Sequence, residues 1–337
     1  MNMNVKSPYA PQIPGATGGA GYGAGSASIV NGQLVVNGSG AGDNIAINQD
    51  KAGNYHVMLN GKHQCFRGCD VNGVTVNGGR GNDNIQIGAN VKNLQVNGGR
   101  GDDVIDNRSA NAVLSGGRGN DRIYNDGANA RINGGRGNDQ VLNQGNGSRV
   151  RGGRGRDKLV NNASNARIDG GRGFDTISNV GNNNRLVGGR GSDHIKSQGN
   201  GNTLDGGRGA DALTSNGNGN RIWGKSGNDA INVQGSLNHV SGGRGADSMV
   251  TNGSFNRVRG GRGNDNMFAC GLGNTIQGDR GWDQIGVMGL GNTAFGGQGC
   301  DTMTGLGFNT LCGGPGFNAI NNMGPGCWGS LLLSQLF

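Results

Sequence analysis

Thirteen aspartates recur at a fixed spacing, each at the end of a Gly-Gly-Arg-Gly-x-Asp phrase or a close variant of it. An aliphatic residue follows two positions after almost every one of them. From Asp103 to Asp301 every step is 18 residues, the first step is 20, and a worn copy with Asn318 follows after 17. A fixed period of this length is the signature of a repeat architecture. The aspartates are Asp83, Asp103, Asp121, Asp139, Asp157, Asp175, Asp193, Asp211, Asp229, Asp247, Asp265, Asp283 and Asp301.

An arginine stands three residues before most of these aspartates, and Ser226, Gln298 or Pro315 replaces it in the other units. A planar guanidinium can bind a carboxylate bidentately, so one interpretation is a ladder of Arg–Asp pairs that is neutral in every repeat. The other interpretation is a cationic edge that faces an anionic polymer. The arginines are Arg80, Arg100, Arg118, Arg136, Arg154, Arg172, Arg190, Arg208, Arg244, Arg262 and Arg280.

No arrangement typical of catalysis is present in the sequence. The four histidines are scattered, no acidic pair stands out beyond the repeat aspartates, and no nucleophile is singled out. We therefore expect no catalytic residues and no enzyme activity.

Two apolar positions in each 18-residue unit must hold these side chains in place. In the unit that begins at Gly116, Ile123 anchors a short strand after the Gly-rich turn, and Ile132 anchors a second strand after a weaker turn. Two strands and two turns make one flattened coil, and stacked coils lie about 4.8 Å apart. The sequence therefore predicts an all-β parallel β-roll or β-solenoid of about 13–14 coils, capped at both ends, with aliphatic rows facing inward.

Composition supports a narrow solenoid over a broad globular core. Of the 337 residues, 75 are Gly, aromatic residues make up 4%, and every acidic residue is Asp. Helices are disfavoured because Gly and Asn are abundant and Glu is absent. The formal net charge of +8 permits an anionic partner, such as an anionic polymer or a host surface, without selecting one.

Four segments are expected along the chain. Residues 1–28 are small and polar and read as a disordered leader. Residues 29–76 are β-rich, include a hairpin signal at Asn60-Gly61, and predict an N-terminal cap with the first coil. Residues 77–320 are the array, and the apolar residues 321–337 predict a C-terminal cap.

Further rows and clusters accompany the aspartates. We expect a row of asparagines in the alternate turns to stack as an amide hydrogen-bond ladder. A second basic row precedes the second aliphatic position and is expected to point outward, as a solvated face or a docking face for a polyanion. The asparagines are Asn184, Asn202, Asn220, Asn238, Asn256, Asn274 and Asn292, and the arginines of the second row are Arg131, Arg149, Arg167, Arg185, Arg221 and Arg257.

The six cysteines lie outside the long middle of the array and are expected to be cap residues, either paired or free. They are Cys65, Cys69, Cys270, Cys300, Cys312 and Cys327. A zinc site could be formed by His56, His63, Cys65 and Cys69, but their spacing along the chain matches no standard zinc-binding pattern.

The phrase Gly-Gly-x-Gly-x-Asp-x-aliphatic-x resembles the nonapeptide of the haemolysin-type calcium-binding (RTX) repeat. In that family two nonapeptides form one coil of a parallel β-roll, and calcium lies between successive turns, held by the Asp carboxylate and backbone carbonyls. The resemblance implies calcium ligands at the thirteen repeat aspartates, on one edge only, because the alternate nonapeptides lack Asp. Calcium takes six to eight oxygen ligands, which Gly-rich turns can supply.

The repeat arginines depart from the family, whose repeats are acidic overall. One calcium and one Asp leave +1 in each coil, and Arg raises this to +2, so neighbouring coils would repel along the edge. Either an anionic partner lies there, or an Arg–Asp pair replaces the calcium ion.

The sequence leads to two functional hypotheses. The first is a secreted, non-enzymatic, RTX-like calcium-binding β-roll that acts as a structural, adhesive or virulence-associated module. The second is a metal-free Arg–Asp solenoid delivered by type III secretion as an effector or scaffold. A polyanion along the Arg edge is compatible with both. Nucleic acid is disfavoured because aromatic residues are sparse, and ice binding because Arg occupies the position where a flat row of Thr would be needed.

Export is expected to use a type I or type III route, with the cell surface or a host cell as the destination. No run of about 18 apolar residues could span a membrane, and the N-terminal segment lacks the apolar core of a Sec signal peptide. The leader is similar to those of type III substrates, and the apolar C-terminal end is distantly similar to the tails of type I substrates.

Overall fold

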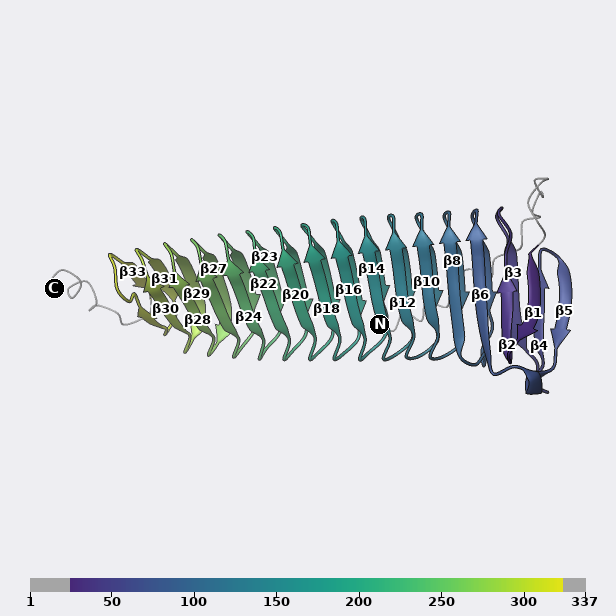
Figure 1. Cartoon of the computed structure of the whole chain (residues 1–337). Helices are drawn as coiled ribbons and strands as arrows, with labels where there is room; N and C mark the ends of the chain where they lie inside the picture. Colours follow the sequence, from purple (N-terminus) through teal and green to yellow (C-terminus); the bar gives the residue numbers. More distant parts are fainter. Residues whose placement is uncertain (1–24, 324–337) are drawn as a thin grey trace.

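The chain forms a long rod of stacked coils, in which strands alternate between two facing sheets (Figure 1). The computed structural model describes residues 25–323. In these residues a single 3-10 turn, η1 (Gly68–Asp70), interrupts an otherwise all-β chain, and no helix is long and apolar enough to cross a membrane. The predicted parallel β-solenoid is therefore confirmed.

Each coil contributes one strand to each sheet. Sheet 1 contains β1 (Ser26–Val30), β2 (Gln33–Asn37), β6 (Gly73–Arg80), β8 (Leu94–Arg100), β10 (Val113–Arg118), β12 (Arg131–Arg136), β14 (Arg149–Arg154), β16 (Arg167–Arg172), β18 (Arg185–Arg190), β20 (Thr203–Arg208), β22 (Arg221–Ser226), β24 (His239–Arg244), β26 (Arg257–Arg262), β28 (Thr275–Arg280), β30 (Thr293–Gln298) and β32 (Thr310–Cys312). Sheet 2 contains β3 (Asn44–Gln49), β4 (Tyr55–Leu59), β5 (Lys62–Phe66), β7 (Asn84–Ile87), β9 (Val104–Asn107), β11 (Arg122–Asn125), β13 (Gln140–Asn143), β15 (Lys158–Asn161), β17 (Thr176–Val180), β19 (His194–Gln198), β21 (Ala212–Asn216), β23 (Ala230–Gln234), β25 (Ser248–Asn252), β27 (Asn266–Leu272), β29 (Gln284–Leu290), β31 (Thr302–Leu306) and β33 (Ala319–Met323).

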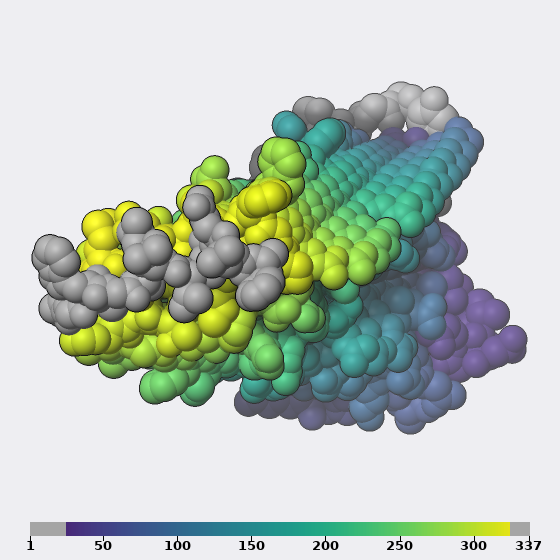
Figure 2. All heavy atoms as spheres, turned by 90° about the vertical axis from the view of Figure 1, so that its left-hand side faces the viewer, coloured from purple at the N-terminus to yellow at the C-terminus, as the bar shows by residue number. Residues whose placement is uncertain are grey.

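Neighbouring coils pair in parallel and in register, residue for equivalent residue. Ile132 of β12 lies beside Leu114 of β10 and Val150 of β14, and Ile123 of β11 lies beside Val141 of β13. Equivalent residues therefore form straight rows along the rod. Figure 2, which looks from the C-terminal coils, shows these rows running from the yellow coils toward the blue ones.

The core is a pair of aliphatic rows between the two sheets. All residues of both predicted rows are buried, with at most 3% of their surface exposed. Each fully buried aliphatic side chain contributes about 1.5–3 kcal/mol to stability. The repeated short strand thus stabilises the coil stack, although no single coil could enclose a core alone.

The Gly-rich turn favours glycine at two kinds of position, shown by β12 and the turn that follows, although Lys225 and Asp279 occupy the second kind in two coils with positive φ. At Gly134 an added Cβ would lie 2.4 Å from the carboxylate of Asp139, so this position must lack a side chain. At Gly135 the backbone φ is +120°, which L-residues other than glycine rarely adopt. This angle breaks the strand alternation, and the following Arg136 is exposed while Asp139 is buried.

The N-terminal end of the stack is closed by antiparallel strands. β1 pairs antiparallel with β2, while β4 pairs antiparallel with β3 and β5 with β4. The hairpin β4–β5 turns at Asn60 and Gly61, which both have positive φ. The predicted leader was to end at Ser28, but β1 begins at Ser26, so its last three residues belong to this cap. The rest of the predicted leader, residues 1–24, lies outside the described residues.

At the C-terminal end the last strand, β33, runs to Met323, three residues past the predicted end of the array. The remainder of the predicted C-terminal cap, residues 324–337 with Cys327, lies outside the described residues.

Candidate calcium-binding edge

The thirteen repeat aspartates form one straight row at the turn between sheet 1 and sheet 2. Each follows a sheet 1 strand and precedes a sheet 2 strand, and each is at most 2% exposed. The parallel register of the strands on both sides brings equivalent turns of neighbouring coils together. We call this the Asp edge.

One oxygen of every carboxylate on the Asp edge is hydrogen-bonded to the preceding coil. The backbone N–H of Asp121 donates to Oδ1 of Asp139 at 2.9 Å, and that of Asp139 donates to Oδ1 of Asp157 at 2.8 Å. The same contact repeats from Asp43 to Asn318, with lengths from 2.7 to 3.0 Å. These bonds align the carboxylates along the rod.

The other oxygen, Oδ2, is buried without a hydrogen-bond partner in all thirteen aspartates. At Gly98 the position of an ideal Cβ lies 2.4 Å from Oδ2 of Asp103 and 2.6 Å from the carbonyl oxygen of Gly116 in the next coil. A carboxylate oxygen and a carbonyl oxygen from two coils thus lie close to the same point, and no donor in the described residues is bonded to Oδ2. Buried polar atoms in native proteins nearly always have a partner, and a hard cation such as calcium suits this all-oxygen set.

Burial also changes the protonation of the row. Burial raises the pKa of Asp139 and Asp175 to about 7 and that of Asp157 to about 6, against an ordinary value of 3.8. The backbone N–H donated to each carboxylate lowers the pKa, and neighbouring carboxylates raise that of Asp139 and Asp175 further. An isolated ionised row is therefore unfavourable, and a cation or a proton must offset its charge.

The first coil shows how a carboxylate on this edge can be satisfied within the protein. Asp43 occupies the equivalent turn, but its oxygens accept hydrogen bonds from Ser39 and from the side chain of Asn60. Asp43 consequently needs no cation and belongs to the cap.

The repeat arginines lie on the other side of the turn from the carboxylates. Each is exposed, whereas the aspartates are buried, and no ion pair between the two rows occurs in residues 25–323. The Arg–Asp ladder that the sequence allowed is therefore absent from this structure. The physical reason is the positive φ of the residues on both sides of the arginine, for example Gly135 and Gly137 beside Arg136, which turns the Arg side chain outward.

The opposite turn carries the row of asparagines, which we call the Asn edge. All seven predicted asparagines are buried. The ladder forms, but its donors are mostly backbone groups: the N–H of Asn184 donates to Oδ1 of Asn202 at 2.8 Å, and that of Asn202 to Oδ1 of Asn220 at 2.7 Å. Nδ2 of Asn202 donates to the Gly181 carbonyl at 3.0 Å.

A true amide–amide ladder lies elsewhere, at a position that sequence reasoning missed. Nδ2 of Asn107 donates to Oδ1 of Asn125 at 2.8 Å, and the contact repeats through Asn143 and Asn161 to Asn179. These residues stand two positions after the first aliphatic residue of their coils. Their 18-residue spacing together with period-2 alternation was the signal that could have revealed them.

The second basic row is exposed along the outer face of sheet 1, as predicted. Arg131, Arg149 and Arg167 lie side by side at the start of β12, β14 and β16.

The residues proposed for zinc meet only in part. Nδ1 of His56 lies 3.1 Å from Nε2 of His63, and Nε2 of His56 lies 3.2 Å from Oδ2 of Asp50. No group of three or more His, Cys, Asp or Glu side chains placed to hold a metal occurs in the described part of the chain. The five described cysteines are free thiols, and Cys270 lies within β27 rather than in a cap.

Comparison with known proteins identifies the repeat. The family model of the RTX calcium-binding nonapeptide repeat matches residues 108–141, 145–177, 180–213, 198–231, 214–249 and 241–269. Among solved structures, the chain is similar to a hyperactive, Ca²⁺-dependent, β-helical antifreeze protein from an Antarctic bacterium, with 23% identity, 77% of each chain covered and a TM-score of 0.36. No curated protein matches.

The repeats matched within residues 108–269 are therefore RTX calcium-binding nonapeptide repeats. The chain contains a calcium-binding structural repeat module folded as a parallel β-solenoid.

Proposed function

We propose that the chain is a calcium-stabilised rod that works outside the bacterial cell as a structural or adhesive module rather than as an enzyme. In this proposal calcium lies along the Asp edge, where the thirteen repeat aspartates and the carbonyls of the Gly-rich turns would hold it. Calcium supplies positive charge at oxygens that have no other partner. The observation that carries the proposal is the unbroken row of buried Oδ2 atoms without hydrogen-bond donors.

The residues of the Asp edge would contribute in three ways. The backbone N–H groups align the carboxylates through Oδ1. The first motif glycine leaves room for the carboxylate to turn inward. The aliphatic rows exclude water from the interior between the two edges. Binding that requires the folded stack adds its free energy to the stability of the fold.

The test is calcium binding by the whole chain at pH 7.5. Calcium-stripped protein is titrated with calcium by calorimetry while circular dichroism follows the β-structure. We expect many calcium ions per molecule, in proportion to the number of Gly-rich turns, and a large rise in thermal midpoint. A chain that folds equally well in excess chelator and takes up no calcium would refute the proposal.

The position outside the cell is tested separately by export from a bacterial host. Deletion of residues 1–28 tests a type III route, and deletion of residues 321–337 tests a type I route. If the full-length chain stays inside cells that have a type I or a type III secretion system, this part of the proposal is contradicted.

A further inference from the structure

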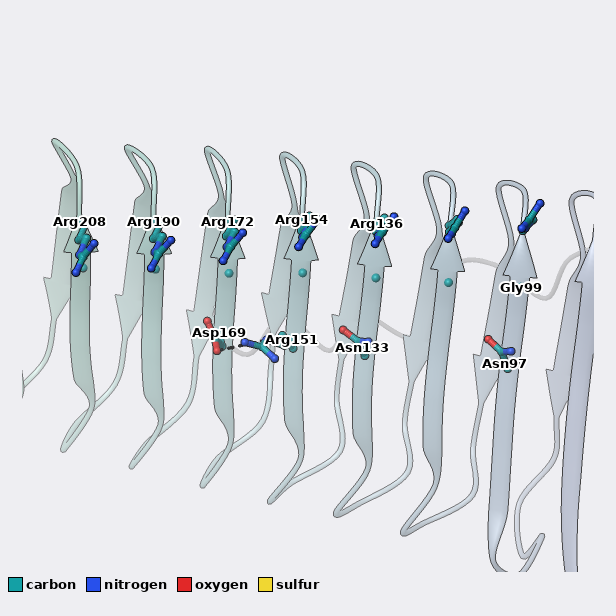
Figure 3. A pocket seen from close by; sticks show the side chains of 18 of the residues that line it. Asn97, Gly99, Asn133, Arg136, Arg151, Arg154, Asp169, Arg172, Arg190 and Arg208 are labelled. Atoms are coloured by element: carbon teal, nitrogen blue, oxygen red, sulfur yellow. Dashed lines mark ion pairs between the residues drawn. The ribbon is translucent and has the colours of Figure 1, made fainter.

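A long groove runs along sheet 1 beside the Asp edge. It extends over the coils from Ser39 to Ser226. Its floor is the second glycine of each Gly-rich phrase, and one wall is the row of eight arginines from Arg80 to Arg208. The far wall is mixed and includes Asn97, Asn133 and Arg151. Figure 3 shows the labelled row arginines from Arg136 to Arg208 aligned at the same end of successive strands.

The groove is strongly cationic. Its lining has ten basic side chains against two carboxylates, which leaves a net charge of +8. This equals the formal charge of the entire chain. The groove is therefore a major concentration of positive charge on the described part of the chain.

The guanidinium groups of the row arginines are available to an external anion. None of the eight forms an ion pair within residues 25–323. The two carboxylates of the far wall are already paired: Asp169 lies 3.7 Å from Arg151, and Asp205 lies 3.7 Å from Arg185 and 4.0 Å from Lys225 (Figure 3 marks the first pair). Since like charges repeat at about 4.8 Å along the row, anions supplied from outside would relieve their repulsion.

The spacing and shape of the row select the kind of anion. The arginines are straight and regular, one in each coil, and their guanidinium forks bind carboxylates well. A duplex presents phosphates on a helical path, so only a few of them could follow a straight groove. No aromatic side chain lines the groove, so single-stranded nucleic acid would find no stacking platform. In an extended polysaccharide, the length of one sugar along the chain is close to the spacing between neighbouring coils, about 4.8 Å.

We propose that this groove binds an extended acidic polysaccharide with a carboxylate on every sugar, one sugar to each coil. The groove ends at β22, where Lys225 occupies the floor glycine position and its Nζ lies 5.2 Å from the ring centroid of Trp223. A second, shorter hollow continues beyond this point past Arg244, Arg262 and Arg280. The inference goes beyond the calcium-binding role and does not require calcium, because the groove is cationic without it.

The test uses a fluorescent oligogalacturonate long enough to span the eight row arginines, with anisotropy measured at fixed free calcium and several salt concentrations. The groove variant carries R136Q, R154Q and R172Q. The control variant carries R131Q, R149Q and R167Q, which removes one exposed arginine from the same three strands, outside the groove. Circular dichroism with calcium verifies that both variants fold.

We expect the groove variant to bind about tenfold more weakly and to show a smaller salt dependence. The control variant should stay within about twofold of the parent chain. A hyaluronan oligosaccharide of equal length, with a carboxylate on every second sugar, should bind more weakly than the galacturonate. Equal losses in both variants, no binding by the parent chain, or tighter groove-dependent binding of oligothymidylate would each overturn the proposal.

Failure here is distinguishable from failure of the calcium-binding role, because the two variants keep every repeat aspartate. Normal calcium uptake without polysaccharide binding would reject the groove proposal alone.

Discussion

The Asp edge and the Asn edge are the two turns of each coil, and both connect neighbouring coils through side-chain hydrogen bonds, with different residues. On both edges a side-chain Oδ1 accepts a backbone N–H from the preceding coil, at 2.8 Å for Asp157 and 2.7 Å for Asn220. The edges differ in the second polar atom. An asparagine can donate its Nδ2–H to a carbonyl, as Asn202 does to Gly181, whereas the Oδ2 of an ionised aspartate can only accept and here has no donor.

The difference is therefore one of charge and donors within a shared backbone frame. All thirteen Oδ2 atoms of the Asp edge lack a hydrogen-bond partner. On the Asn edge, the Nδ2 atom lacks a partner in only three of the seven asparagines, Asn220, Asn238 and Asn256. The Asn edge is close to self-sufficient, and the Asp edge is complete only with a cation or a proton. The stability of the Asp edge should thus depend on the calcium concentration and pH of the solution, whereas that of the Asn edge should not.

The largest expected effect is an opposite pH dependence with and without calcium. Burial raises the pKa of ten row carboxyls to about 6 or 7 from 3.8, so the folded state binds protons more tightly than the unfolded chain. This stabilisation is fully present below about pH 4 and is lost as the pH rises through about 7. In calcium-free buffer the thermal midpoint should therefore rise as the pH falls from 7.5 to 4.5.

In saturating calcium the trend should reverse, because protons compete with the cation for the carboxylates. Thermal melts followed by circular dichroism at constant ionic strength measure both series. If the thermal midpoint changes with pH in the same way in both buffers, protons and calcium do not compete for the Asp edge. The inferred difference between the Asp edge and the Asn edge would then be wrong.

The next effect converts part of one edge into the other. Replacing Asp157, Asp175 and Asp193 with Asn keeps the Oδ1 acceptor and places a donor at the position of Oδ2, near the carbonyl of the first motif glycine of the next coil. Each change removes an unsatisfied buried oxygen, an effect of about 1–3 kcal/mol. We expect a higher thermal midpoint in calcium-free buffer at pH 7.5 and fewer calcium ions bound by calorimetry.

The matched control for this variant is D126N, because Asp126 is exposed on the opposite turn of the same coil as Asp121. It should change neither the midpoint nor the calcium count. A triple variant that melts earlier than the parent chain without calcium would show that the buried carboxylates stabilise the fold by themselves.

The reverse substitution, N202D, should destabilise the Asn edge. The new carboxylate would lose the bond to the Gly181 carbonyl and leave an unpaired buried oxygen, at a cost of about 1–3 kcal/mol. A lower thermal midpoint at pH 7.5 that calcium does not restore is the expected result. Restoration by calcium would show that either turn can hold the cation.

The smallest effect tests the exception on the Asp edge. At Asp43 the carboxylate already accepts hydrogen bonds from Ser39 and Asn60. In D43N the new amide N–H would face a donor group of Ser39 or Asn60, so one hydrogen bond would be lost and stability would fall by about 1 kcal/mol. The same substitution should therefore have opposite signs at Asp43 and in the row, as measured by melts in calcium-free buffer. Equal signs would mean that the hydrogen-bond accounting of this edge is wrong.

Much of the fold could be predicted because the period leaves few alternatives. The 18-residue spacing of Ile123, Val141 and their equivalents requires that each coil repeat the one before it, and the buried rows follow from period-2 alternation. The candidate ligands could also be named, since each aspartate has the same place in the phrase. The amide ladder from Asn107 to Asn179 escaped notice because a shorter run of asparagines is a weaker repeat signal.

The sequence by itself determined the period, the inward aliphatic rows and the single carboxylate in each coil, because these depend on spacing along the chain. Only the tertiary structure decided on which side of the turn each charge lies. Local backbone geometry at Gly135 and its equivalents turns the guanidinium groups outward while the carboxylates turn inward. Three residues of separation cannot distinguish a salt-bridge ladder from two independent rows, because the outcome depends on the backbone angles of the glycines on both sides of the arginine, such as Gly135 and Gly137 beside Arg136.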